Sequence, residues 1–249
     1  MNEKKFDAKG SIYEKGRPAY PEQLFDYLLK TQLVQSNTTV ADIGAGTGIF
    51  TSQLSPFVSN IFAVEPNEDM RKKAEKRYKG FSNIISVNGT AENTTLSANS
   101  VDLITVAQAF HWFDRASFKL ECQRILSCRG KVFLVWNDRP LTSKIIKDNF
   151  EVNKKFCPNF KGSSNGIDFS KNGFMDFFEG DFKLVEFENN FLYDKDAFVF
   201  RNLSSSYAPK AGDDSYDDYV KAILKVFDMH SENGVVNYPY ITRCYVGKV

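Results

Sequence analysis

One glycine-rich turn, Asp42-Ile43-Gly44-Ala45-Gly46-Thr47-Gly48, constrains the fold of this chain more than any other sequence feature. A short β-prone stretch, residues 38–41, precedes the turn, and residues 49–54 read as the opening of a helix. Glycine has no side chain, so a strand, turn and helix of this kind let backbone N–H groups approach a ligand closely. We therefore expect a ligand at this turn, although the turn alone also suits a purely structural connection.

A second acidic residue supports the ligand interpretation. Glu65 ends the next apolar run and lies 17 residues past Gly48, a distance that suits an acid binding the hydroxyl groups of a ribose. The dinucleotide fingerprint is G-x-G-x-x-G, whereas this chain has G-x-G-x-G with Asp42 two residues before the first glycine. A nicotinamide-dependent oxidoreductase remains an alternative, but it leaves the third glycine one position early and Asp42 unexplained.

The composition favours a small-molecule substrate. The 249 residues suffice for one large domain or two small ones, and 42% of them are hydrophobic, which is ordinary for a globular protein. The 32 basic and 31 acidic side chains leave a net charge of +1. Because the chain carries no strong basic field to attract phosphates, we expect no nucleic-acid partner.

The cysteines and the apolar runs indicate the compartment. Cys122, Cys128, Cys157 and Cys244 form no C-x-x-C pair and have no nearby histidine set, so we expect no metal site and no disulfide framework. No apolar run follows Met1, which predicts no signal peptide. No stretch reaches the ~18 apolar residues of a membrane helix, so no membrane association is expected. The reducing cytoplasm is the expected location.

The hydrophobic pattern predicts a first helix over residues 21–33 and then alternating strands and helices. The strands are predicted at residues 39–43, 61–65, 84–88, 101–107 and 131–136, and the helices at 48–55, 67–78 and 117–126, with a turn at 128–130. This alternation indicates an α/β fold with a parallel, doubly wound sheet. Right-handed crossovers place all strand carboxyl ends on one edge, where ligands bind. The residues that fall at such ends are Gly44, Glu65, Gln108 and Asn137.

The chain after Asn137 follows a different pattern. Helices are predicted at residues 144–156, 196–203 and 215–230, and strands at 182–193 and 238–246. Residues 158–172 are rich in Gly, Ser and Asn and are predicted to form a loop.

Four further segments extend the glycine turn and Glu65 into a larger set of motifs. They are residues 13–21 (Tyr-x-x-x-Arg-Pro-x-Tyr-Pro), 89–92 (Gly-Thr-Ala-Glu), 107–114 (Ala-Gln-Ala-Phe-His-Trp-Phe-Asp) and 121–130. The whole set resembles the Rossmann-like methyltransferases that use S-adenosylmethionine (SAM). Within these it resembles the small-molecule, trans-aconitate methyltransferase-like group (methyltransferase type 11), over about residues 13–137. Arg129 departs from the pattern, because Pro or Gly often stands there.

The resemblance implies a doubly wound, mostly parallel seven-stranded sheet with a helical cap over the substrate side. The last two strands would be an antiparallel pair that completes the sheet. The chain would form a single structural domain with three parts: an N-terminal lid and helix (1–36), a SAM-binding core (37–140), and the cap helices with the last two strands (141–249).

The resemblance also implies SAM as the cofactor. Glu65 would accept hydrogen bonds from the ribose hydroxyls, Arg17 would match the cofactor carboxylate, and Asp42 would accept from its ammonium directly or through water. Arg17 as a solvated residue and Met70 as core filling are the alternatives at those two positions. The full set of candidate cofactor-binding residues is Arg17, Asp42, Gly44, Ala45, Gly46, Gly48, Glu65, Pro66, Met70, Thr90, Ala91, Glu92, Gln108 and Ala109.

Candidate catalytic and substrate-binding residues are fewer. His111 follows the strand predicted at 101–107, so it is the best candidate for a general base or a substrate hydrogen-bond partner. Its alternative role is to orient the loop, because a carboxylate acceptor is already nucleophilic and needs no base. The candidate substrate-side residues are Tyr13, Tyr20, Trp112 and Asn137. An anionic substrate could meet any of four basic residues, among which the sequence does not choose: Arg139, Arg201, Lys210 and Arg243.

The sequence therefore predicts a SAM-dependent methyltransferase that acts on a small molecule, with O-methylation of a carboxylate as the leading reaction by resemblance. The alternatives are an N-methyltransferase of a small molecule, a catalytically silent SAM-binding protein, and the nucleotide-dependent oxidoreductase. The sequence does not predict the methyl acceptor or the oligomeric state.

Overall fold

The computed structural model describes residues 18–162, 166, 174–178 and 182–249, and its centre is a seven-stranded sheet. The strand order is β3-β2-β1-β4-β5-β9-β6, in which the first five strands are parallel and β9 is antiparallel to both β5 and β6. This arrangement confirms the predicted doubly wound sheet with a final antiparallel pair. The strands are β1 (Thr39–Ile43), β2 (Asn60–Val64), β3 (Ile84–Val87), β4 (Val101–Ala107), β5 (Leu126–Asp138), β6 (Phe182–Glu188) and β9 (Ile241–Gly247).

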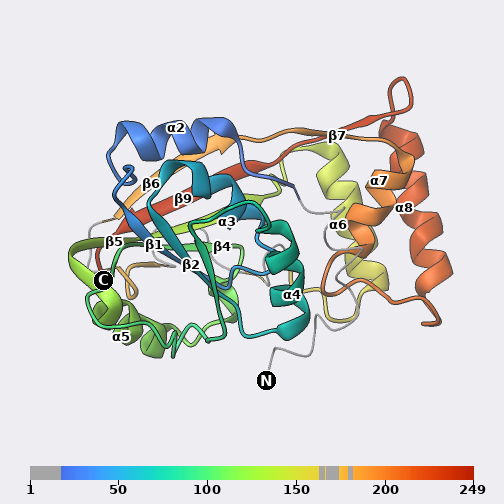
Figure 1. Ribbon diagram of the computed structural model, residues 1–249. Helices are drawn as coiled ribbons and strands as arrows, with labels where there is room; N and C mark the ends of the chain where they lie inside the picture. The colour runs from blue at the N-terminus through green and yellow to red at the C-terminus, as the bar shows by residue number, and fades with distance from the viewer. Residues whose placement is uncertain (1–17, 163–165, 167–173, 179–181) are drawn as a thin grey trace.

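Helices cover both faces of the sheet, with α2 and α5 on opposite sides (Figure 1). No helix in the described part of the chain has both the length and the apolar composition that crossing a membrane requires. The helices are α2 (Glu22–Lys30), α3 (Ile49–Leu54), α4 (Glu68–Arg77), α5 (Arg115–Ile125), α6 (Lys144–Phe156), α7 (Lys195–Leu203) and α8 (Tyr216–His230), with short 3₁₀ turns η2 (Ser55–Phe57) and η3 (Phe110–Trp112).

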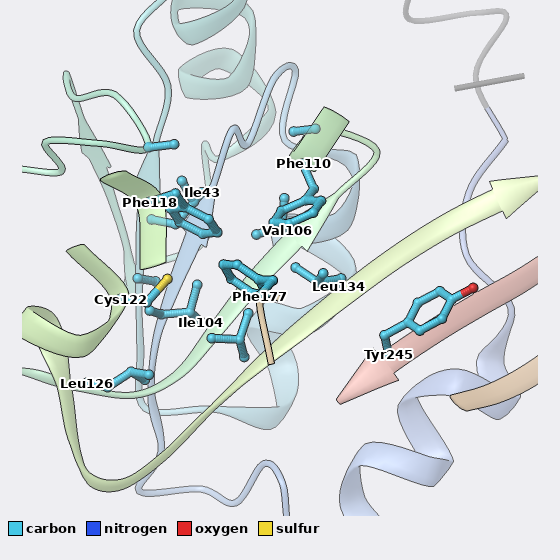
Figure 2. Packing of buried hydrophobic residues seen from close by; sticks show 14 of the residues in the cluster. Ile43, Ile104, Val106, Phe110, Phe118, Cys122, Leu126, Leu134, Phe177 and Tyr245 are labelled. Atoms are coloured by element: carbon cyan, nitrogen blue, oxygen red, sulfur yellow. The ribbon is translucent and has the colours of Figure 1, made fainter. Parts of the chain in front are cut away.

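The two faces of the sheet form separate hydrophobic cores because side chains alternate along a strand. In β5, Phe133 and Val135 pack with α2 and α3, whereas Leu134 and Trp136 pack with α5. The second core is rich in aromatic rings from η3, α5 and Phe177, which gather beside aliphatic side chains of the sheet (Figure 2). The two-sided burial explains the nearly unbroken apolar run that predicted β4.

The helices α6, α7 and α8 pack together, with a small antiparallel sheet of β7 (Phe191–Tyr193) and β8 (Val236–Tyr238), around a third hydrophobic cluster. The chain enters and leaves this unit at one edge of the main sheet, because Ile241 pairs with Asp138 on one side and Glu188 on the other. That edge carries the carboxyl ends of the parallel strands, and the unit lies beyond it (Figure 1).

Two strand predictions were wrong in their extent, because each predicted strand is two strands in different sheets. Residues 182–193 divide into β6 and β7, and residues 238–246 belong to the end of β8 and to β9. Pro239 lies between β8 and β9 and has no N–H to donate to a ladder. Asn189 follows β6, and its side-chain amide donates to the Ala19 carbonyl at 2.9 Å.

The prediction of a turn at 128–130 before a strand at 131–136 was also wrong, because β5 begins at Leu126 and includes those residues. The pairing of β5 with β4 shifts register there, from Val101 with Leu126 to Leu103 with Lys131. A Cβ on Gly130 would lie 2.6 Å from Leu126 Cδ2, so the strand folds tightly at this point. Residues 128–130, which the sequence assigned to a turn, lie in this irregular part of β5.

A buried carboxylate joins the elements that surround the glycine turn. Asp42 of β1 has no exposed surface and accepts hydrogen bonds from the hydroxyls of Thr51 in α3 and Thr105 in β4 (2.8 Å for Thr105). Burial raises the pKa of Asp42 to about 6, against the opposing effect of the two threonine hydroxyls, and the charge of Glu65 raises it further. Tyr78 donates to Thr51 from the end of α4, 3.2 Å away, which completes this polar node.

Because the pKa of Asp42 is raised by folding, the folded protein binds more protons than the unfolded chain between about pH 4 and pH 6. Stability should therefore fall as pH rises through this window. We expect wild type to lose about 1 kcal/mol of unfolding free energy between pH 5 and pH 7 that Asp42→Asn does not lose. Urea denaturation at both pH values measures this difference. Equal pH dependence in the two proteins would contradict a raised pKa.

Candidate functional site

A cavity of about 280 Å³ lies at the carboxyl edge of the sheet, in front of β1, β2 and β4. Its walls come from the glycine turn, the junction of β2 with α4, the loop after β3 and the segment after β4. The predicted cofactor residues that line it are Gly44, Ala45, Gly46, Glu65, Pro66, Met70, Thr90, Ala91, Glu92, Gln108 and Ala109. A cavity therefore lies at the edge of the sheet where the sequence predicts a ligand.

Gly48 and Gly46 have different roles in the turn. Gly48 has φ +79°, and a Cβ there would lie 2.4 Å from the Tyr78 ring, so this glycine permits the close packing of α3 against α4. Gly46 has φ +58°, and the nearest atoms to a Cβ there would be the Gly44 carbonyl oxygen at 3.9 Å and the Met70 sulfur at 4.0 Å. A side chain at position 46 would therefore enter the open cavity. Gly48 does not itself line the cavity.

The carboxylate of Glu65 is held in place by the backbone of both neighbouring turns. The Gly46 N–H donates to Oε2 at 2.8 Å, and the Asn67 N–H donates to Oε1 at 2.9 Å. The side chain is 7% exposed and lines the cavity. Charge-assisted hydrogen bonds from fixed backbone donors leave this carboxylate little freedom, so it is oriented before any ligand arrives.

The start of α4 forms the wall beside Glu65. The Asn67 side chain caps the helix by accepting from the Met70 N–H at 2.9 Å, as an N-cap asparagine should. Arg71 donates from Nη1 to the Glu65 carbonyl at 2.9 Å and to the Pro66 carbonyl at 3.2 Å. These bonds fix the side chains of Pro66 and Met70 as an apolar surface next to the carboxylate.

The loop after β3 closes another side of the cavity. Ala91 is 5% exposed and gives an apolar wall, and the Thr90 N–H donates to the Asn93 carbonyl at 3.0 Å in a turn. Glu92 accepts from the Asp114 N–H at 3.0 Å, which ties this loop to the start of α5. Glu92 therefore has a structural partner in addition to its place on the cavity wall.

The segment after β4 begins with an unusual backbone conformation. Gln108 has φ +60°, which is uncommon for a residue other than glycine, and its side-chain amide donates to the Asn137 carbonyl at 3.3 Å. Ala109, Trp112 and Phe113 then line the cavity. His111 lies in η3 with its ring 4.8 Å from that of Trp112, and it is not among the lining residues. Its catalytic role stays a prediction.

The remaining candidates divide into three groups. Asp42 lies beneath the glycine turn, and Asn137 is buried and donates to the Pro18 and Ala19 carbonyls at 3.4 and 3.2 Å, so neither lines the cavity. Tyr20 does line it and is held by two hydrogen bonds with the Gln53 side chain, both 3.0 Å. The predicted residues Tyr13 and Arg17, like most of the predicted lid, lie outside the described residues.

Sequence reasoning missed several lining residues: Pro18, Thr47, Ile49, Phe50, Asn67, Ala107 and Phe113. All of them neighbour a motif in sequence, so their position was the available signal. What the sequence lacked was the direction in which each side chain points.

The chain matches known methyltransferases in sequence and in structure. Residues 41–134 match the family described as a methyltransferase domain. An uncharacterised methyltransferase of Mycobacterium tuberculosis is 37% identical over 134 residues, which are 54% of this chain and 52% of that protein. The chain therefore matches about half the length of such curated relatives.

Two solved structures share the fold across most of the chain. A candidate type II methyltransferase from Anaeromyxobacter dehalogenans has a TM-score of 0.68 at 19% identity, covering 93% of this chain and 97% of that one. A SAM-dependent methyltransferase from Aquifex aeolicus has a TM-score of 0.53 at 19% identity, covering 71% of this chain and 89% of that one. The sheet order, the matched residues and these shared folds lead to one conclusion. Residues 41–134 match the methyltransferase domain family, and the chain as a whole shares the Rossmann-like fold of solved methyltransferases.

Proposed function

We propose that this chain binds SAM in the cavity and transfers its methyl group to a small molecule. The observation that carries the proposal is the Glu65 carboxylate, which Gly46 and Asn67 orient beside the open face of the glycine turn. A fixed carboxylate next to a backbone surface without side chains suits a ligand with vicinal hydroxyls and a polar chain that must lie close to the main chain.

The residues of the cavity fit SAM group by group. Glu65 would accept from the ribose hydroxyls, and the backbone of residues 44–46 would contact the methionine part. Met70 and Ala91 offer apolar surface for the adenine. Asp42 already accepts from two threonine hydroxyls, so it would act on the cofactor ammonium through the turn or through water. When bound, SAM supplies an electrophilic methyl group on a positively charged sulfur.

The chain's own task in such a transfer is to align the acceptor and to exclude water. Tyr20, Trp112 and Phe113 surround the cavity with aromatic rings, whose faces favour a cation. O-methylation of a carboxylate is the reaction we favour, because an ionised carboxylate needs no base and His111 does not line the cavity. N-methylation of an amine and silent SAM binding are the alternatives. The second would show cofactor binding without turnover.

The proposal has four further parts. The segment 1–36 acts as a lid and first helix, and the unit 141–249 caps the substrate side, where the chain meets the carboxyl edge of the sheet. The partner is a small molecule and not a nucleic acid, in keeping with a net charge of +1. The protein works in the cytoplasm.

Glu65→Ala should weaken the binding of S-adenosylhomocysteine, the demethylated cofactor, by about 1–3 kcal/mol, since it removes a polar partner of the ribose. Isothermal titration calorimetry measures the effect. Asp69→Ala, an exposed acid in the first turn of α4, is the control for loss of charge and should bind as wild type does. Unchanged affinity in Glu65→Ala would remove Glu65 from the site, and tighter binding of NAD than of SAM would reject the cofactor.

Gly46→Ala should lower the affinity for S-adenosylhomocysteine about tenfold or more, because the new methyl group enters the cavity. Gly234→Ala is a matched control, since Gly234 also has positive φ (+81°) and a Cβ there meets nothing within 4 Å. Both variants should lose about 1–2 kcal/mol of stability from the left-handed backbone. An equal cofactor affinity in the two variants would place the ligand elsewhere.

His111→Ala reports on the acceptor. If the acceptor is a hydroxyl or an amine, single-turnover rates should fall about 10²–10⁴-fold while SAM binding is kept. If it is a carboxylate, the loss should be smaller and mostly in substrate binding. His230→Ala is the control, because this second histidine pairs with Asp148 at 2.7 Å in the cap. A wild-type rate and affinity in His111→Ala would show that His111 only shapes its loop.

A further inference from the structure

The cap unit contains a set of buried and half-buried basic and aromatic side chains, which we call the arginine–tyrosine cluster. Its members come from different segments that meet near the carboxyl edge of the sheet. One follows β5, one lies in α7, one lies in the loop after α7, and two lie at the junction of β8 with β9. They are Arg139, Arg201, Tyr207, Tyr238 and Tyr240.

Among the described residues, the two guanidinium groups contact neutral partners. Arg139 donates from Nη1 to the Tyr207 hydroxyl at 3.0 Å. Arg201 donates from Nε to the Tyr240 hydroxyl at 2.9 Å, and its guanidinium carbon lies 4.5 Å from the centre of the Tyr238 ring. Its Nη1 donates to two amide oxygens, those of Asn202 at 3.0 Å and Asn149 at 3.3 Å.

No aspartate or glutamate in the described segments forms an ion pair with Arg139 or Arg201. Arg201 is 5% exposed, and burying a guanidinium without an acid costs free energy. Arg243, another basic candidate, differs because its Nε lies 3.4 Å from Asp138 and 3.3 Å from Glu186. Lys210 is exposed. Of the four basic candidates, Arg139 and Arg201 therefore combine a positive charge with the lack of an acidic partner in the described segments, which is what an anion site needs.

The pKa of the Tyr207 hydroxyl indicates a positive electrostatic potential at this position. Burial acts to raise the pKa of Tyr207, but the charges of Arg139 and Arg201 outweigh it, so that the pKa lies below its usual value. Both guanidinium groups therefore act on the same point. That point is one where a negative charge would be stabilised.

One hydrogen bond and a short stretch of chain connect the cluster to the proposed cofactor cavity. Gln108 lines that cavity, and its amide donates to the carbonyl of Asn137. Arg139 follows Asn137 by two residues, which an extended chain spans in about 7 Å. Arg139 is therefore close along the chain to a residue that contacts the cavity wall, while Arg139, Arg201 and Tyr207 are not themselves lining residues.

We propose that Arg139, Arg201 and Tyr207 form a subsite that binds an oxyanion of the methyl acceptor, a carboxylate or a phosphate group. The planar guanidinium fork matches both anions, and the Tyr207 hydroxyl adds one more donor. The role in methyl transfer rests on the proposed function, whereas the binding of an anion here does not.

The test titrates succinate, citrate and inorganic phosphate separately into the full chain saturated with S-adenosylhomocysteine, with calorimetric detection. We expect at least one of these anions to bind wild type with a Kd on the order of millimolar or tighter. Arg139→Gln should weaken that binding about tenfold or more, and Tyr207→Phe about fivefold, the factor for one lost hydrogen bond. Lys210→Gln removes an exposed charge and should bind as wild type does.

Each outcome decides a separate point. A preference for the carboxylates or for phosphate identifies which oxyanion the acceptor carries. The subsite is rejected if none of the three anions binds wild type, or if Arg139→Gln binds them as tightly as wild type. If Arg139→Gln does not fold, Tyr207→Phe keeps the ring and decides alone. Anion binding without any binding of S-adenosylhomocysteine would reject the proposed function and keep the subsite.

Discussion

The hydrogen bond from the Gly46 N–H to the Glu65 carboxylate is the contact on which the candidate site depends. It exists because β1 and β2 are neighbours whose ends are level, with Ile43 paired to Val64. The N–H groups of Gly44 and Ala45 both bond to the Val64 carbonyl, so the glycine turn is fixed on the end of β2 before α3 begins. A ligand therefore meets groups that are already oriented, and little conformational entropy is lost on binding.

The buried polar groups around this edge divide by charge. Asp42 and Glu65 place carboxyl groups at the glycine turn, and burial of Asp42 costs stability while its hydrogen bonds join β1 to α3 and β4. Arg139 and Arg201 place positive charge in the cap. This division matches the proposed pair of ligands, since SAM carries cationic groups and the acceptor an anion. Titratable groups with perturbed pKa values are often found at functional sites.

Local sequence patterns predicted the elements that are buried on both faces or strongly amphipathic. The apolar run 101–107 is β4, and the pattern over 144–156 is α6. The pattern did not reveal where strands change sheets. Alternation continues through 182–193, but β6 and β7 belong to different sheets, and Pro239 separates β8 from β9. The sheet that a strand joins depends on which distant strand has unpaired backbone N–H and C=O groups beside it. The hydrophobic periodicity of a segment contains no information about that distant strand.

The sequence by itself determined the glycine turn, the acid after β2 and the five alternating parallel strands, because each follows from short-range spacing and the handedness of crossovers. Only the tertiary structure decided how the polar residues are used. Asn137, for which a substrate-side role stays a prediction, holds residues 18 and 19 through hydrogen bonds between segments more than a hundred residues apart. Arg243 is paired with acids, whereas Arg139 and Arg201 bind neutral groups within the part of the chain that the structure describes. A charge has its effect through its neighbours in space, and folding chooses those neighbours.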